Sequence, residues 1–229
     1  MNYKIAIDGP GSSGKSTTAV ELSKKLSFIY VDTGAMYRTV GLYCLRNNVD
    51  LENEEEVVKV LDDINMEFFY VDGVQQIKLN GENVSKEIRE NDISTCASII
   101  SKYEKVREKL VAIQRGLANN NSIIMDGRDI GTVVLPDADL KIFLTARDEV
   151  RAERRYKELK EKGQDVTYEG ILKDLRDRDY RDTHRENSPL KQADDAILVD
   201  TSDMTKEEVV DYIYDLFMKK VGDLNEKND

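Results

Sequence analysis

The stretch Gly9-Pro10-Gly11-Ser12-Ser13-Gly14-Lys15-Ser16 decides the fold of this chain, because it matches G-x-x-x-x-G-K-[ST], the pattern of a loop that holds nucleotide phosphates. The apolar run before the motif, Lys4–Asp8, predicts a short strand. The segment that begins at Lys15 and ends at Leu26 predicts a helix with one apolar face. Strand, glycine-rich loop and helix in this order form the context in which the motif binds phosphate. A chance match in a flexible turn is the alternative, and the flanking elements disfavour it.

The residue types in this loop suit phosphate chemistry. Gly9, Gly11 and Gly14 let the backbone wrap closely around a phosphate, where a Cβ atom would clash or forbid the required φ. The N–H groups of the loop and of the helix start then point toward the phosphate oxygens. Lys15 adds a positive charge for the β- and γ-phosphates, and the Ser16 hydroxyl is a ligand for Mg²⁺. The loop therefore predicts a site for a phosphate chain with its magnesium ion.

Composition limits the class of protein. A chain of 229 residues suits one domain with an insert, and a net charge of −11 argues against binding to a nucleic acid polymer. Cys44 and Cys96 show no zinc spacing, so we expect reduced thiols in the core. His184 is the only histidine, which excludes histidine triads. The chain has no apolar run of about 18 residues and no room for a signal peptide before its first strand, so we expect a cytoplasmic protein without a membrane span. No heptad seam demands a partner, and we expect a monomer.

Short apolar runs alternate with helical patterns along most of the chain. This alternation predicts an α/β fold, a three-layer arrangement with a parallel sheet and helices on both of its faces. The helical patterns include 33–46, 54–64 and a last helix that opens with a capping box at Thr205 and Glu208. The expected core strands are Lys4–Asp8, Phe28–Val31, Ser122–Met125, Leu140–Leu144 and Ala196–Val199.

One segment departs from this alternation. Met66–Val71 and Gln75–Leu79 flank Asp72-Gly73, and Asn80-Gly81 follows, so the segment predicts an antiparallel hairpin and a further turn. We expect a β-meander inserted over residues 65–100 into a core formed by 1–64 and 101–229.

The kind of reaction depends on residues outside the loop. A GTPase needs an N-K-x-D segment, which the chain lacks. The run Ile123-Ile124-Met125-Asp126 could end in the acidic residue of an ATP-driven motor, but Gly127-Arg128-Asp129 follows at once, which is unusual for a motor. Arg128 would stand at the carboxyl end of a core strand, where open α/β sheets bind ligands. There it could hold a second phosphate.

Eight arginines occur between Arg147 and Arg185 in this acidic chain. Pairs such as Arg154 with Glu158, four residues apart, favour a solvated face with salt bridges. The concentration of arginine beside a phosphate-binding loop favours instead a helical lid, over about 147–165, that brings guanidinium groups to a transferring phosphoryl group.

The chain resembles the bacterial cytidylate kinases, in the nucleoside monophosphate kinase group. Nearly the whole chain takes part, with I-D-G-P-x-x-x-G-K-S at 7–16, D-T-G-A-M-Y-R at 32–38, D-G-R-D-I-G-T-V-V at 126–134 and R-D-x-R-D-x-x-R at 178–185. The resemblance implies phosphoryl transfer from ATP, with Mg²⁺, to CMP or dCMP. It also makes the insert a monophosphate-binding subdomain.

The resemblance further implies roles for single residues. It places the ATP site on Gly9, Pro10, Gly11, Ser12, Ser13, Gly14, Lys15, Ser16, Thr17, Arg151 and Arg154. It places the acceptor site on Thr33, Arg38, Ser98, Arg107, Arg128, Asp129, Arg178, Asp182 and Arg185. The expected catalytic residues are Lys15, Arg128, Arg154 and Arg185.

Two questions stay open at the level of sequence. Asp129 could accept the exocyclic amine of cytosine, which uracil lacks, or it could pair with Arg128 and only shape the loop. A kinase of another small acceptor, a non-catalytic nucleotide-binding module and a nucleic-acid-dependent ATPase are the alternative functions, and the last is the least consistent with the acidic balance.

Overall fold

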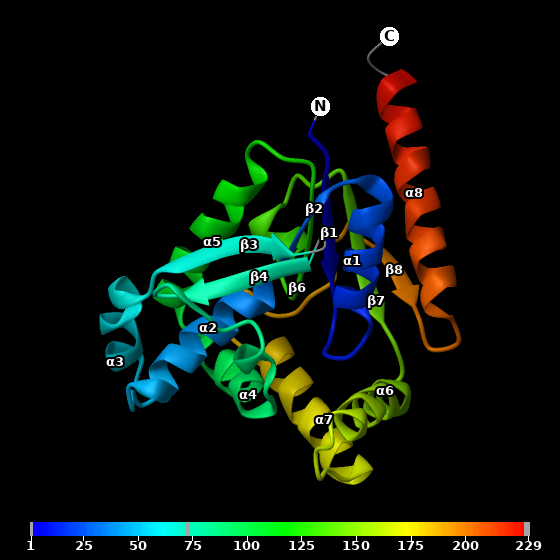
Figure 1. Cartoon of the computed structure of the whole chain (residues 1–229). Coiled ribbons are helices and arrows are strands. Elements are labelled where there is room, and N and C mark those ends of the chain that lie inside the picture. The colour runs from blue at the N-terminus through cyan, green and yellow to red at the C-terminus, as the bar shows by residue number, and fades with distance from the viewer. Residues whose placement is uncertain (1, 72–73, 227–229) are drawn as a thin grey trace.

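A parallel sheet of five strands forms the centre of the computed structural model, which describes residues 2–71 and 74–226 (Figure 1). Its strand order is β2-β6-β1-β7-β8, and every neighbouring pair is parallel. The expected strands are confirmed with small shifts at their ends. They are β1 (Lys4–Asp8), β2 (Ile29–Asp32), β6 (Ile123–Gly127), β7 (Leu140–Thr145) and β8 (Ile197–Asp200).

Helices cover both faces of this sheet, which confirms the three-layer prediction. Along β1, Ile5 and Ile7 belong to the buried cluster that includes residues of α1 (Lys15–Leu26) and α8 (Lys206–Glu226). Ala6, between them, belongs to the cluster on the other face, with residues of α5 (Glu104–Ala118). Alternate side chains of a strand point to opposite faces, so one strand anchors both helical layers.

Two helices can be compared with the boundaries predicted from the sequence. Thr205 and Glu208 form the expected capping box before α8, with the Thr205 N–H donating to Glu208 Oε2 at 2.8 Å. The single helix expected over 54–64 is wrong in extent. Glu54–Lys59 forms α3, capped by Asn53, and a separate 3-10 helix follows at Leu61–Asp63.

The phosphate loop lies tightly against the sheet. Gly9 has φ of 148°, and a Cβ atom there would stand 2.0 Å from the carbonyl oxygen of Leu144 on β7. Gly14 has φ of 97° and caps α1. These positions require glycine, because side chains rarely adopt such φ values and the space at Gly9 is already filled.

The expected meander is present in the insert. Its strands are β3 (Met66–Val71), β4 (Val74–Leu79) and β5 (Glu82–Asn83), paired antiparallel in that order. The turn at Asp72-Gly73 lies outside the described residues, and Asn80-Gly81 forms the second turn. The 3-10 helix Glu87–Arg89 and the helix α4 (Asn91–Ile100) follow, and neither was expected from the sequence.

The insert shares its buried core with the rest of the chain. Ile77 on β4, Ile88 and Ile93 pack in one cluster with Met36 of α2 (Thr33–Arg46) and Leu110 of α5. The bounds 65–100 stay a prediction, since this shared cluster crosses them.

Two further helices lie at the carboxyl end of the sheet (Figure 1). Helices α6 (Asp148–Glu161) and α7 (Tyr168–His184) form a hairpin, and their apolar contacts make a small cluster of Ala152, Leu159, Ile171 and Leu175. A lid function for this hairpin stays a prediction. Within 2–71 and 74–226, no helix combines the length and apolar character that crossing a membrane requires.

The contact at Gly9 predicts a loss of stability on substitution. Gly9→Ala should lower the free energy of unfolding by about 2–4 kcal/mol, because it adds backbone strain and a clash with Leu144. Gly116→Ala is the control, since a Cβ there meets nothing within 4 Å inside α5, and it should raise stability by about 0.5–1 kcal/mol. Urea unfolding measures both, and equal stabilities would contradict the tight packing of the loop.

Candidate active site

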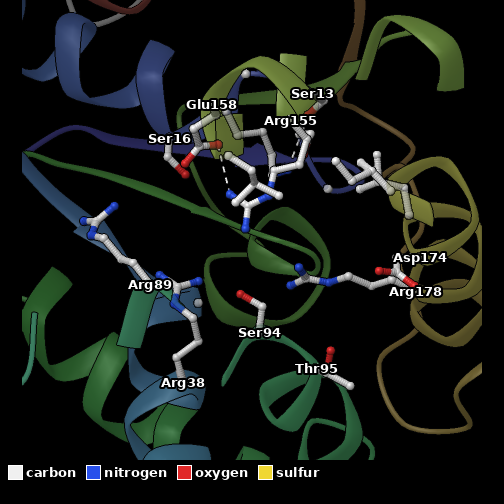
Figure 2. Close-up of a pocket in the computed structure, with 18 of the residues that line it drawn as sticks. Ser13, Ser16, Arg38, Arg89, Ser94, Thr95, Arg155, Glu158, Asp174 and Arg178 are labelled. Atoms are coloured by element: carbon white, nitrogen blue, oxygen red, sulfur yellow. Dashed lines mark hydrogen bonds and ion pairs between the residues drawn. The ribbon is translucent and has the colours of Figure 1, made fainter. Parts of the chain in front are cut away.

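A cleft of about 680 Å³ opens at the carboxyl ends of the strands. The phosphate loop lines one side of it, and residues of α2, the insert, β6 and the α6–α7 hairpin line the others. Figure 2 shows Arg155 of α6 and Arg178 of α7 reaching into this space from the hairpin, and Arg155 Nη1 pairs with Glu158 Oε2 of α6 at 2.9 Å. Ser94 and Thr95 come from α4 of the insert. The cleft therefore joins the phosphate loop, α2, the insert, the carboxyl end of β6 and the α6–α7 hairpin, in each of which the sequence placed site residues.

The loop residues are held in place by short contacts. Lys15 Nζ donates to the carbonyl oxygen of Pro10 at 2.5 Å and to Ser13 Oγ at 3.3 Å. Burial lowers the pKa of the Lys15 ammonium well below its ordinary value, and the nearby guanidinium groups of Arg128 and Arg178 lower it further. The cleft thus holds more positive charge than its carboxylates neutralise. An anion bound there would relieve the repulsion between the positive groups.

The hydroxyl of Ser16 and the carboxylate of Asp126 lie together at the start of α1. Ser16 Oγ donates to Asp126 Oδ2 at 2.8 Å, and Tyr30 Oη donates to Asp126 Oδ1 at 2.8 Å. Burial raises the pKa of Asp126, and the charge of Asp32 adds to the rise. A hydroxyl and a carboxylate are donors that Mg²⁺ prefers, and a cation there would favour the ionised carboxylate.

The two arginines expected near ATP lie behind the loop. Arg151 is buried, with Nη1 donating to the Gly11 carbonyl at 3.0 Å and pairing with Asp179 at 2.6 Å. Arg154 Nη2 donates to the Thr201 carbonyl at 2.7 Å, and Thr201 Oγ1 donates in turn to the carbonyl oxygen of Ser13 at 3.2 Å. In the described part of the chain, both arginines support the loop backbone from outside the cleft lining. Their predicted contact with ATP stays untested.

A second cavity of about 60 Å³ adjoins the cleft. Gly34, Gly127, Arg128 and Arg178 line both spaces, so the two are neighbours. The lining of the small cavity includes all the expected acceptor residues except Arg38: Thr33, Ser98, Arg107, Arg128, Asp129, Arg178, Asp182 and Arg185. Four separate stretches of the chain supply them. The fold therefore brings together residues that the sequence could group only by resemblance.

Two guanidinium groups share one carboxylate between these spaces. Arg128 Nε pairs with Asp182 Oδ2 at 2.8 Å, while Arg178 Nε stands 4.0 Å from the same oxygen. Burial would lower the pKa of Arg128, but the charge and hydrogen bond of Asp182, together with the charges of Asp179 and Asp126, outweigh burial and raise the pKa. Burial, together with the charge of Arg128, lowers the pKa of Arg178 to about 10. The shared wall thus carries an excess of positive charge.

Asp129 also lines the small cavity and lies between two other arginines. Its carboxylate pairs with Arg107, and Arg185 Nη2 lies 3.7 Å from its other oxygen. The alternative that Asp129 pairs with Arg128 is wrong as to partner, since Arg128 binds Asp182. Burial raises the pKa of Asp129, and its arginine neighbours oppose that rise.

The remaining acceptor residues lie nearby. Arg38 lines the cleft and its Nη2 donates to Asp32 Oδ2 at 2.7 Å. Thr33 Oγ1 donates to the backbone carbonyl of Asp126 at 2.7 Å, which fixes the start of α2 to β6. Ser98 Oγ accepts from Arg181 Nε at 3.3 Å, so α4 and α7 meet at the small cavity.

Asp8 connects the two binding regions. It ends β1, directly before Gly9, and its two carboxylate oxygens accept the N–H groups of Ile130 at 2.8 Å and Gly131 at 2.7 Å. These residues open the π-helical turn Ile130–Val134 that follows Asp129. Burial raises the pKa of Asp8 to about 6, although the two backbone hydrogen bonds and Lys15 oppose the rise.

Sequence reasoning missed several residues of the cleft. Arg155 and Arg181 belong to the arginine groups, but helical spacing alone did not show which members face inward. Asp126 carried a signal, because it ends an apolar strand. Arg89 and Asp92 carried none, since they lie in the part of the insert where no helix was predicted.

Comparison with known proteins settles the family. The family model described as cytidylate kinase matches residues 5–219. This chain belongs to the cytidylate kinase family. It is 50% identical over 218 residues to a cytidylate kinase of Caldicellulosiruptor saccharolyticus, covering 95% of this chain and 96% of that protein. It is 51% identical over 221 residues to a cytidylate kinase of Caldanaerobacter subterraneus subsp. tengcongensis, covering 96% of each.

A solved structure supports the fold of this cytidylate kinase family member. A gluconokinase from Sinorhizobium meliloti 1021 aligns with a TM-score of 0.51 at 13% identity, covering 99% of this chain and 98% of that one. At this identity the likeness shows the fold alone. The family expected from the sequence motifs is therefore confirmed by the relatives, and the fold by this neighbour.

The environment of Asp8 predicts a pH dependence of stability. Because the folded protein binds this proton more tightly than the unfolded chain, the contribution of Asp8 is full below pH 3.8 and is lost as the pH rises through about 6. The difference in unfolding free energy between wild type and Asp8→Asn should therefore fall by about 3 kcal/mol from pH 4 to pH 7. Urea unfolding across this range measures it. A difference that stays constant with pH would contradict the burial argument.

Proposed function

We propose that this protein transfers the γ-phosphoryl group of ATP to CMP or dCMP and releases ADP with CDP or dCDP. The family assignment supports this activity. The observation that carries it is the shared wall: Arg128 and Arg178 line both the phosphate-loop cleft and the small cavity. A phosphate chain on the loop and an acceptor phosphate at the small cavity would meet there.

On the donor side, the backbone of residues 9–17 would cradle the ATP phosphates, and Lys15 would pair with the β- and γ-phosphates. Mg²⁺ fits this site, because Ser16 Oγ and the Asp126 carboxylate stand together at the loop. When bound, the ion would neutralise charge on the phosphate oxygens. Of the described residues, no group of three or more acidic, histidine or cysteine side chains could hold a metal alone, and an ion carried by phosphates needs only one or two protein ligands.

On the acceptor side, Arg38 and Arg128 would hold the monophosphate, while Arg178, Asp182 and Arg185 would contact the ribose and phosphate. Ser98, Arg107 and Asp129 would read the base. Cytosine presents an amine that a carboxylate accepts, whereas uracil presents a carbonyl that Asp129 would repel. The Arg107–Asp129 pair supports this role, since Arg107 holds the carboxylate in place and both residues line the small cavity.

The reaction needs no general base, because the attacking phosphate oxygen is already ionised at neutral pH. Positioning and charge neutralisation would supply the rate, through Lys15, Arg128 and Arg185. Arg155 of α6 lines the cleft and is placed to add to this charge. Arg154 would first have to leave Thr201 to take part as the sequence predicts.

A monomeric state, a cytoplasmic location and the absence of nucleic acid partners stay predictions that rest on composition. The acidic balance of the chain, with a net charge of −11, supports the last of them.

Removal of the Lys15 ammonium tests the donor site. Lys15→Ala should lower kcat/KM for ATP and CMP by two orders of magnitude or more, because an important charge on the transferring phosphoryl group is lost. Lys24→Ala, at an exposed position of the same helix, should leave it unchanged. A coupled ADP-release assay with CMP, dCMP, UMP and AMP measures rate and acceptor together, and thermal unfolding confirms the fold. Turnover of Lys15→Ala within a few-fold of wild type would contradict the assignment.

Removal of the Asp129 carboxylate tests base selection. Asp129→Ala should reduce the preference for CMP over UMP by about 10- to 100-fold, more than it reduces the maximal rate with CMP. Asp137→Ala is the control, because Asp137 is an exposed aspartate shortly after the π-helical turn that follows Asp129. An unchanged preference would assign the reading of the base to other residues.

A further inference from the structure

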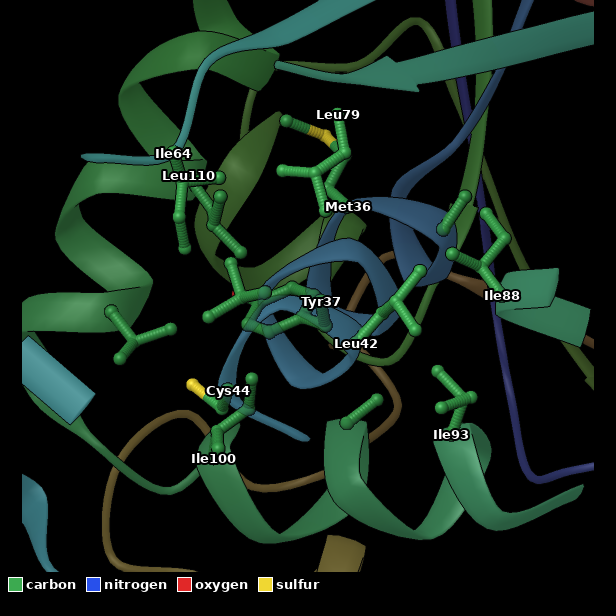
Figure 3. Packing of buried hydrophobic residues seen from close by; sticks show 14 of the residues in the cluster. Met36, Tyr37, Leu42, Cys44, Ile64, Leu79, Ile88, Ile93, Ile100 and Leu110 are labelled. Atoms are coloured by element: carbon green, nitrogen blue, oxygen red, sulfur yellow. The ribbon is translucent and has the colours of Figure 1, made fainter. Parts of the chain in front are cut away.

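Gln75 is a polar residue in an apolar row. It lies on the side of β4 that also carries Ile77 and Leu79, and only 5% of its surface is exposed. Ile77 and Leu79 pack into the cluster around α2, where Figure 3 shows Leu79 beside Met36. Burying an amide among apolar side chains is unfavourable unless its polar atoms are paired. The contacts of this amide therefore indicate its role.

One atom of the amide joins the insert to the core sheet. Gln75 Oε1 accepts the backbone N–H of Asp32 at 2.6 Å. Asp32 ends β2, which is an edge strand of the five-stranded sheet, so its outer side has no neighbouring strand in that sheet. Gln75 supplies from the insert the acceptor that a neighbouring strand would otherwise provide. Within the described residues, Gln75 Nε2 has no hydrogen-bond partner, so the side chain makes this one bond.

Asp32 links the insert to the cleft, because its backbone binds Gln75 and its side chain binds residues of α2. Its Oδ1 accepts the N–H of Ala35 at 2.9 Å and caps α2, while its Oδ2 pairs with Arg38 at 2.7 Å. Burial would raise the pKa of Asp32, but the charges of Arg38 and Arg89 and the hydrogen bonds from Ala35 and Arg38 together lower it, and the carboxylate stays ionised. The guanidinium of Arg38 is thus aimed by a side chain whose own backbone is held by the insert.

We propose that Gln75 is a positioning residue for acceptor binding. Through Asp32 it fixes Arg38, so that capture of the acceptor phosphate depends on where the insert lies. This inference rests on the proposed function, in which Arg38 binds that phosphate. In the described part of the chain, the side chain of Gln75 makes no hydrogen bond to the phosphate loop, and its effect should therefore fall on the acceptor and spare ATP.

A matched pair of variants tests the proposal. Gln75→Met keeps the length of the side chain and removes the acceptor oxygen, together with the unpaired Nε2. It should raise the KM for CMP by about 3- to 10-fold, the size of one hydrogen bond, and leave the KM for ATP within about 2-fold. Gln76→Met is the control, because the same residue type follows on the other, more open side of β4. Calorimetry of CMP binding without ATP should show the same weakening.

A double-mutant cycle with Arg38→Met tests the route. If Gln75 acts through Arg38, then Gln75→Met should change CMP affinity by less than about 2-fold once Arg38 is gone. An equal loss in both backgrounds would overturn the proposal. So would an unchanged KM for CMP in Gln75→Met, or equal rises of the two KM values, since a general loosening would affect both substrates.

A second variant keeps the test possible if Gln75→Met does not fold. Thermal unfolding checks Gln75→Met, and Gln75→Leu, of similar volume, is measured if the first does not fold. Failure of both would overturn the proposal, because the bond would then serve the fold. A wild-type protein that does not phosphorylate CMP would contradict the proposed function itself, whereas an active wild type with unaffected Gln75 variants would contradict only this inference.

Discussion

Buried positive charge at the carboxyl edge of the sheet is the constraint on which the site depends. Lys15, Arg128 and Arg178 are held close enough for each arginine to lower the pKa of the lysine, in a chain whose net charge is −11. Like charges in a low-dielectric space repel strongly, and burial adds a desolvation penalty. The fold sustains this arrangement because packed strands and helices fix the backbone around it. Occupation by phosphate would convert the penalty into attraction.

The carboxylates in the site neutralise this positive charge to different extents in different places. Asp182 is shared between Arg128 and Arg178, and Asp129 stands between Arg107 and Arg185. Within residues 2–71 and 74–226, the Asp126 carboxylate accepts hydrogen bonds from two hydroxyls alone, those of Ser16 and Tyr30. The excess of guanidinium therefore lies at the wall between the two spaces, and the oxygen donors lie at the loop. This separation suits an anion at the wall and a cation beside the loop.

The sequence was most informative where a pattern is local. The phosphate loop, the parallel strands and the capping box at Thr205 follow from spacing, glycine placement and apolar runs, because neighbours in the chain determine them. Which arginine faces the cleft does not, since Arg154 and Arg155 are adjacent in the chain and only the packing of α6 separates their roles. The pairing of Asp129 with Arg107 could not be predicted from spacing either, because the two residues are 22 positions apart, with the rest of α5 and all of β6 between them.

The long-range contacts of the insert could not be predicted from the sequence either. Nothing in the pattern of β4 marked Gln75 as different from Gln76, because the bond to Asp32 exists only once two sheets meet. The helix α4 was missed for a related reason. Its polar start, Asn91–Asp92, looks like a loop until the buried face of Ile93, Ala97 and Ile100 packs against α2.

The bond from Arg151 to the Gly11 carbonyl has a mechanical consequence. The same guanidinium pairs with Asp179, so one side chain ties the phosphate loop to both helices of the hairpin. The hairpin has its own small apolar cluster, separate from the two clusters on the faces of the sheet. Arg151 lies in the first turn of α6, so the backbone of the loop and the start of this helix are held at one fixed distance by a single side chain. The geometry of the loop and the position of the hairpin are therefore mechanically joined.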